Sequence, residues 1–232
     1  MKKISILVLL ATAFLLVYSC NNDNDDEPEN LVTKKQVIDN YAKIVYQNYL
    51  DSYNSAVKLQ ATLNSFTANP SEAGFNSSKA DWLAAREIYG QTEVYRGSNG
   101  PIDSEGNESW IINNEGQMNA WPLDEAYIDY VTASSDAYSG YSAYNAGIIA
   151  GTETITENLL IGKNEGENDK SISTGWHAIE FLLWGQDETN PSEVKAGLRE
   201  YTDYTTADFK ERRKTYLNVV SDILVNDLKT LV

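Results

Sequence analysis

An early segment of the chain, residues 33–66, contains neither glycine nor proline. Apolar side chains recur along it at intervals of three and four residues: Val37, Tyr41, Ile44, Ala56, Leu59, Leu63 and Phe66. This spacing places them on one face of a helix. The segment therefore predicts one long amphipathic helix, which needs other elements to cover its apolar face.

The remaining chain carries helix start and stop signals but no alternating strand pattern and no hairpin signal. We expect further helices at 77–96, 122–130, 152–161, 171–184 and 205–231. Ser77 or Ser78 is expected to cap the first of these helices, and Thr205 to open the last with a capping box. The sequence thus predicts an all-α fold, an antiparallel bundle of about four principal helices joined by long ordered loops such as 132–150.

Composition excludes several classes of protein. The 232 residues include 34 acids against 18 bases, a formal net charge of -16, which argues against binding to nucleic acid. Cys20 is the only cysteine and His177 the only histidine, so a cysteine-based zinc site and a two-histidine protease site are ruled out within this chain. No GxSxG elbow of a serine hydrolase is present.

The first 19 residues are typical of a secretory signal, with a basic Met-Lys-Lys start followed by a short apolar run. The run ends in Val17-Tyr18-Ser19-Cys20, which resembles a bacterial lipobox. We therefore expect a lipoprotein signal peptide at 1–19 and lipidation of Cys20, which would anchor the protein to the outer membrane of the cell envelope. A plain signal peptide with an incidental cysteine is the alternative.

Residues 20–31 carry five acids and almost no apolar side chain, which indicates a solvated tether. The tether would space a helical domain, residues 32–232, from the membrane. An acidic run after a lipidated cysteine also resembles the surface-export signals of some Gram-negative lipoproteins, so the periplasmic and the surface face both remain open.

The sharpest chemical signal is the segment Gly175-Trp-His177-Ala-Ile-Glu180. His177 and Glu180 are three residues apart and share a helical face, and such imidazole–carboxylate pairs supply metal ligands in helical bundles. The alternative is a structural histidine bonded to Glu180 or to a carbonyl. The apolar residues that follow predict a buried helix, in which a carboxylate needs a cation, a donor or a proton.

Two further segments interleave charged and aromatic residues. The first, DWxxAR at 81–86, continues through Glu93 and Arg96 to the GPID string that ends at Asp103. The second is NAWPLDE, which contains Trp121, Asp124 and Glu125. Acids at a helix start are usually partners of the helix dipole, and charged helix faces are usually solvated. These residues become functional only if they converge on His177.

Together the three segments resemble the imelysin family of envelope proteins, often described as imelysin-like peptidases. The resemblance rests on the GxHxxE motif within the sequence HAIEFLLWGQD and on the blocks at 81–103 and 119–125. It covers residues 33–232. It implies a fold of bundle-like helical halves. Family members are usually longer and carry a second half, so this chain is expected to be incomplete at its C-terminus.

The resemblance also implies a role in iron or haem acquisition, with His177 and Glu180 as candidate metal ligands and Glu93 as a further one. Gly175, Arg86, Arg96, Asp103, Trp121, Asp124 and Glu125 would support the site. A zinc hydrolase normally needs three protein ligands and a general base. One histidine with carboxylates suits a harder ion, so iron is favoured over calcium or zinc.

Three functions follow from this reading. The first is a lipid-anchored, metal-linked binding protein that acts with iron- or haem-uptake partners. The second is a metallopeptidase in which Glu180 or Glu93 is the general base. The third is a surface lipoprotein that binds a ligand or a partner without a metal, with the tyrosines of the loop at 138–144 as an interface. The first is preferred, and the protein is not expected to be an enzyme.

Overall fold

The computed structural model describes residues 32–96, 114–131, 147–186 and 195–232. The chain divides into two compact units, Met1–Tyr41 and Ala42–Val232. In the first unit, the described residues form the beginning of a helix. The expected signal segment and tether with Cys20, the side chain of Asp103, and most of the expected loop at 132–150 lie outside the described residues.

The described residues form helices and connecting segments, with no strand among them, which confirms the all-α prediction. The longer helices are α2 (Lys34–Ala68), α3 (Glu72–Gly90), α8 (Gly175–Trp184) and α9 (Lys210–Thr230). The shorter elements are α4 (Glu93–Arg96), α5 (Glu115–Asn119), α6 (Glu125–Ile128), α7 (Glu157–Lys163) and the 3₁₀ turns η2 (Ile148–Ala150) and η3 (Tyr201–Tyr204). None of the described helices is both long and apolar enough to span a membrane.

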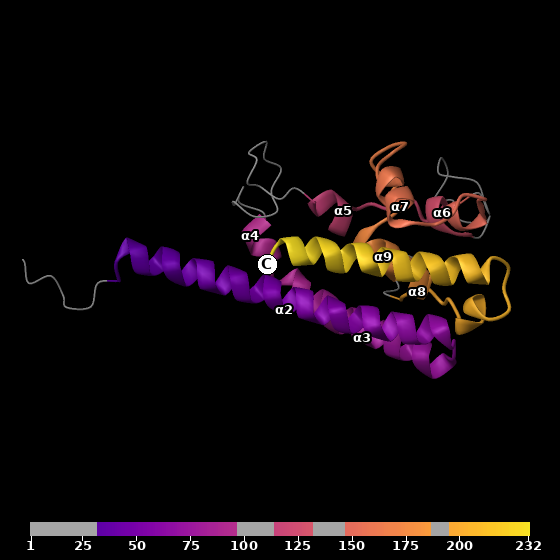
Figure 1. Ribbon diagram of the computed structural model, residues 1–232, viewed down its shortest axis with the longest axis horizontal. Helices are drawn as coiled ribbons and strands as arrows, with labels where there is room; N and C mark the ends of the chain where they lie inside the picture. Colours follow the sequence, from indigo (N-terminus) through magenta and orange to yellow (C-terminus); the bar gives the residue numbers. More distant parts are fainter. Residues whose placement is uncertain (1–31, 97–113, 132–146, 187–194) are drawn as a thin grey trace, which may run out of the picture. The chain divides into compact units, whose positions relative to one another are not determined.

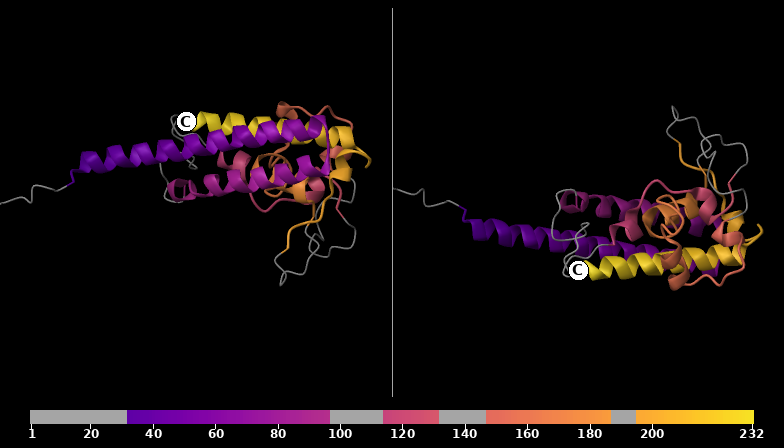
Figure 2. Two further views of the ribbon diagram at one scale, coloured as in Figure 1. Left: turned by 90° about the horizontal axis from the view of Figure 1, so that it is seen from below. Right: turned by 90° about the horizontal axis from the view of Figure 1, so that it is seen from above.

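Helix α2 matches the predicted long helix and packs against two antiparallel neighbours within the second unit. Side-chain contacts pair Gln60 with Asp222 and Thr67 with Asn218, so α9 runs opposite to α2. Helix α3 also runs opposite to α2, since Phe66 packs on Phe75 while Thr62 bonds Asp81. Figures 1 and 2 show the three helices side by side.

The starts of two helices differ from the prediction. Helix α3 begins at Glu72, where the Ser71 hydroxyl accepts a hydrogen bond from Gly74 N, and the expected caps Ser77 and Ser78 lie inside the helix. The capping box expected at Thr205 does not form. Instead η3 and a turn lead to Phe209, whose left-handed backbone (φ 60°) precedes α9.

The helix expected at 122–130 is only one turn long. Asp124 caps that turn, α6, by accepting a hydrogen bond from Ala126 N at 3.1 Å. Pro122 lies outside it, after a cis peptide bond with Trp121. The turn of helix at α5, just before this segment, was not predicted, and both changes matter because this stretch forms one wall of the site.

Helix α8 lies at the centre of the core and contacts α3, α5 and α9. Five of its side chains are fully buried: Trp176, Ala178, Ile179, Leu182 and Leu183. The prediction of a compact apolar helix is therefore confirmed, although the helix begins at Gly175 rather than at Ser171. His177 and Glu180 lie on the side of α8 that this core leaves accessible.

Candidate functional site

A pocket of about 420 Å³ opens beside α8, and it contains both residues of the candidate pair. Helix α3 provides one wall, the segment around α6 a second, and the strap Lys195–Gly197 a third. The lining residues are Trp82, Leu83, Trp121, Leu123, Glu125, His177, Glu180, Phe181, Trp184, Gly185, Lys195, Ala196 and Gly197. This volume is in the range of small-molecule sites in proteins.

The first turn of α8 is held in place by α5. Gly175 has a positive φ of 83°, and a Cβ there would lie 2.3 Å from the carbonyl oxygen of Met118. Only glycine permits this backbone and this close approach. Next to it, the Thr174 hydroxyl donates a hydrogen bond to Gln117 O at 2.7 Å. The glycine of GxHxxE therefore fixes where His177 emerges from the core.

His177 and Glu180 form a direct pair, with Nδ1 of His177 2.8 Å from Oε2 of Glu180. The His177 side chain is 17% exposed and that of Glu180 41%. The ring of Trp121, itself 68% exposed, packs against the imidazole with 4.9 Å between the ring centroids. Trp121 and the His177–Glu180 pair, which belong to separate sequence segments, therefore meet at one site.

Two chemical roles fit this pair. A carboxylate on Nδ1 of a histidine orients the ring and makes Nε2 the nitrogen that binds a ligand. Alternatively, both atoms bind one ion, because two ligand atoms about 2.1 Å from an octahedral ion and at right angles lie roughly 3 Å apart. The observed 2.8 Å is compatible with either arrangement.

The inner walls of the pocket are aromatic. Trp82 meets Trp184 edge to face at 5.3 Å, and it is anchored by a hydrogen bond from its Nε1 to Trp176 O at 3.1 Å. Such edge-to-face pairs add stability beyond simple burial. These walls are thus fixed in position, whereas Trp121 and Leu83 at the rim stay largely exposed.

A second group is centred on Tyr89, whose ring packs against Trp176 of α8 with 5.3 Å between the centroids. Arg86 and Arg96 approach its ring at 5.2 and 4.8 Å, and the Tyr89 hydroxyl donates to Glu115 at 3.0 Å. Arg96 also pairs with Glu115. Burial, with a further contribution from Arg96, lowers the pKa of Arg86, and its buried Nη1 has no hydrogen-bond partner.

The other predicted residues lie elsewhere. Glu93 is exposed on α4 and does not line the pocket. Asp124 is buried as the cap of α6, while the next residue, Glu125, lines the pocket. Over the described residues, no set of three or more His, Cys, Asp and Glu side chains is placed to hold a metal ion.

Comparison with known protein families matches residues 45–232 to the family model named peptidase M75 and described as imelysin. The match covers most of the chain. The chain belongs to the imelysin family. No curated protein matches the chain.

In this imelysin chain, parts of all three sequence blocks meet at the pocket. The block at 81–103 contributes Trp82, the block at 119–125 contributes Trp121 and Glu125, and the GxHxxE block contributes His177 and Glu180. Arg86 and Arg96 belong to the neighbouring group around Tyr89 rather than to the pocket lining.

Sequence reasoning missed the strap Lys195–Gly197, which forms the third wall. The strap packs tightly, since a Cβ on Gly197 would lie 2.4 Å from Trp184 O. Arg199, which follows the strap, donates its backbone N–H to the same carbonyl at 2.9 Å. A glycine and an arginine in a polar stretch gave no signal of these contacts.

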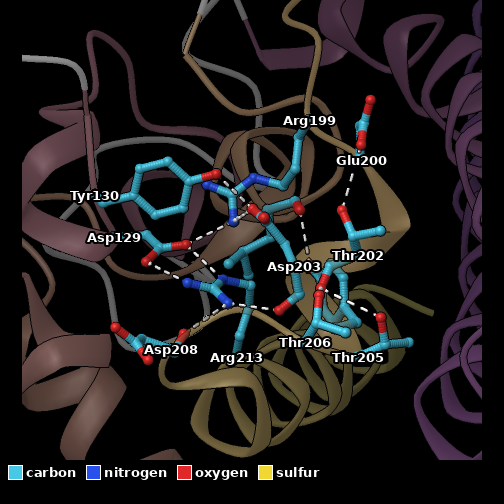
Figure 3. Close-up of polar contacts among 12 residues, drawn as sticks. Asp129, Tyr130, Arg199, Glu200, Thr202, Asp203, Thr205, Thr206, Asp208 and Arg213 are labelled. Atoms are coloured by element: carbon cyan, nitrogen blue, oxygen red, sulfur yellow. Dashed lines mark hydrogen bonds and ion pairs between the residues drawn. The ribbon is translucent and has the colours of Figure 1, made fainter.

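The side chain of Arg199 fastens the strap into a buried ionic cluster (Figure 3). Its Nη1 lies 2.5 Å from Asp129 Oδ2, and Arg213 binds the same carboxylate through Nε at 2.7 Å and Nη2 at 3.0 Å. Burial alone would raise the pKa of Asp129, but the two arginines outweigh it and hold the pKa below its usual value. Burial also raises the pKa of nearby Tyr130 to about 12.

Proposed function

We propose that this imelysin-family protein is an envelope lipoprotein, anchored to the outer membrane through Cys20, that binds iron for uptake at the His177–Glu180 pocket. Iron is the cargo of this function, delivered as an ion or as a complex such as haem. The observation that carries the proposal is the 2.8 Å pair of His177 Nδ1 and Glu180 Oε2 in the wall of a 420 Å³ pocket.

The donor set supports iron better than zinc catalysis. A nitrogen and a carboxylate oxygen together suit iron, whereas a structural or catalytic zinc usually takes three or four protein ligands. The pocket supplies His177, Glu180 and Glu125 as donor side chains, and they do not form a three-residue metal group. A loosely held ion that keeps ligands of its own is appropriate for a protein that passes its cargo to uptake partners.

The test is to titrate the purified protein with Fe²⁺ under anaerobic conditions and to measure the binding affinity by calorimetry. His177→Gln and Glu180→Gln are expected to weaken binding by at least about tenfold, as the loss of a metal ligand or its orienting partner does. Glu157→Gln, which removes an exposed acid on α7, is the matched control and is expected to bind like the wild type.

Absence of Fe²⁺ binding by the wild type, or equal binding by all four proteins, would overturn the iron site. Chelator-sensitive cleavage of unfolded protein that requires His177 would instead support the peptidase activity that the family name carries. The anchor is tested separately, because Cys20→Ala is expected to move the protein from the membrane to the soluble fraction, and retention in the membrane would contradict lipidation.

A further inference from the structure

The pocket is larger and more aromatic than a bare metal ion needs. A hexa-aqua ion occupies about 180 Å³ if each water takes its liquid share of about 30 Å³. The pocket measures about 420 Å³, and three tryptophans and a phenylalanine contribute to its walls. Hydrated ions gain nothing from such walls, whereas organic ligands bury their apolar surface against them.

Among the described residues, the pocket also offers too few ligands to complete the coordination of an ion. His177 and Glu180 offer one nitrogen and one oxygen at adjacent positions, and no three-residue metal group is present over the described residues. In the proposed site, the remaining positions are left to ligands that arrive with the ion. An organic chelator that fills them would also fill the rest of the pocket.

Trp121 is placed to recognise such a chelator. Its ring is 68% exposed at the rim, yet it packs at 4.9 Å against the imidazole of His177. A flat group bound to an ion at His177 would lie beside this ring and cover its exposed face. Covering an exposed tryptophan is favourable, both through buried area and through aromatic stacking.

Charge narrows the class further. Among the described lining side chains, Glu125 and Glu180 are acidic and Lys195 is basic, so the formal charge of this described part of the lining is negative. A polycarboxylate chelate would meet this charge with its own, and like charges disfavour binding. A neutral or cationic chelate is not penalised in this way.

We propose that the physiological ligand is a metal complex with a flat aromatic, uncharged or cationic chelator, held by His177 and Glu180 at the metal and by Trp121 at the chelator. This inference rests on the proposed metal site, and it adds the chemical class of the cargo. It assigns to Trp121 the selection between complexes that carry the same metal.

The test compares two copper(II) complexes, one with bipyridine and one with ethylenediamine. Both are dications, both chelators occupy two positions, and both leave adjacent positions for the protein. They differ in the aromatic body. Since His177 is the only histidine of the chain, binding of copper to other imidazoles does not interfere. Titrations followed by the visible copper band give the two affinities.

We expect the wild type to bind the bipyridine complex about tenfold more tightly, which is the gain that one stacked tryptophan can supply. Trp121→Ala should abolish this preference while it keeps the affinity for the ethylenediamine complex, and Trp121→Phe should retain part of it. The control is Tyr46→Ala, which removes an exposed aromatic ring from α2 outside the pocket and should leave the preference intact.

Equal affinities in the wild type, or a preference that persists in Trp121→Ala, would overturn the aromatic selection while the metal site stands. If neither complex binds, or if His177→Gln binds both as the wild type does, the metal site itself is wrong and the selection falls with it. The two failures are therefore distinguishable in one set of titrations.

Discussion

Asp129 and Glu180 are both carboxylates beside nitrogen bases, yet the chain surrounds them very differently. Asp129 is 3% exposed and receives hydrogen bonds from Arg199 and Arg213 at both of its oxygens. Glu180 is 41% exposed and meets His177 through one oxygen. Asp129 therefore has partners at both oxygens, whereas the contact that the described residues give Glu180 is a single one, at the wall of a pocket.

The difference agrees with the proposed function, in which the buried carboxylate stabilises the fold and the exposed one binds the ligand. A buried charge that has lost a partner is expensive, so the Asp129 cluster must stay intact for the fold. It ties together the segment around α6, the start of α9 and the strap Lys195–Gly197, the last through Arg199, which follows the strap. These segments include two walls of the pocket. The His177–Glu180 pair is partly exposed and lies beside these walls.

The largest loss of stability is expected from breaking the buried ionic cluster around Asp129. Asp129→Asn removes the carboxylate that Arg199 and Arg213 share, and it leaves Arg199 with its longer contact, 3.4 Å from Nη1 to Asp203 Oδ2. Because breaking a buried ion pair is strongly destabilising, we expect about 3–5 kcal/mol of unfolding free energy to be lost. Urea unfolding followed by circular dichroism measures it. A loss below about 1 kcal/mol would show that the fold does not depend on this ionic cluster.

The matched control is Asp81→Asn. The ion-pair partner of Asp81, Lys58, is 70% exposed, so this substitution should lower the unfolding free energy by less than about 1 kcal/mol. Acid gives a second check. Because the folded pKa of Asp129 is lowered, its contribution is present above the unfolded value of about 3.9 and is lost as the pH falls through the folded value. The gap between wild type and Asp129→Asn should therefore shrink only below about pH 4.

The next effect comes from Gly175, which joins the scaffold to the pair. Gly175→Ala places a Cβ against Met118 O and strains a left-handed backbone, so we expect a loss of at least about 2 kcal/mol. Gly162→Ala, inside α7 with open space around the new methyl group, should instead stabilise by roughly 0.5–1 kcal/mol. Thermal unfolding of both variants measures this contrast, and effects of equal sign would contradict it.

The correct predictions rest on local sequence signals. The long helix α2 is predicted correctly because its segment contains no glycine or proline. The three blocks that meet at the pocket could be singled out because they are dense in aromatic and charged residues. Gly175 was expected inside a helix, because sequence does not reveal that a glycine adopts a positive φ. The capping box at Thr205 was also misread, since the chain turns through η3 and Phe209 before α9 begins.

The buried ionic cluster around Asp129 could not be predicted from the sequence. Asp129 is 70 residues from Arg199 and 84 from Arg213, and each lies in a segment whose local pattern is that of a solvated turn or helix face. Only the packing of α6, the strap and α9 brings the three together. Long-range ionic contacts of this kind depend on tertiary structure, whereas the spacing of His177 and Glu180 is a property of one helix.

The smallest effect on stability is expected at the His177–Glu180 pair. This result tests most directly whether the pair and the Asp129 cluster differ in their role. His177→Gln removes a hydrogen bond whose acceptor is substantially exposed, so water replaces the lost partner and the cost should stay below about 1 kcal/mol. Urea unfolding beside Asp129→Asn measures both on one scale. If His177→Gln lost as much as Asp129→Asn, the histidine would be a structural element of the core, and its weaker iron binding would report damage to the fold. A small loss combined with lost binding would instead assign the pair to the ligand.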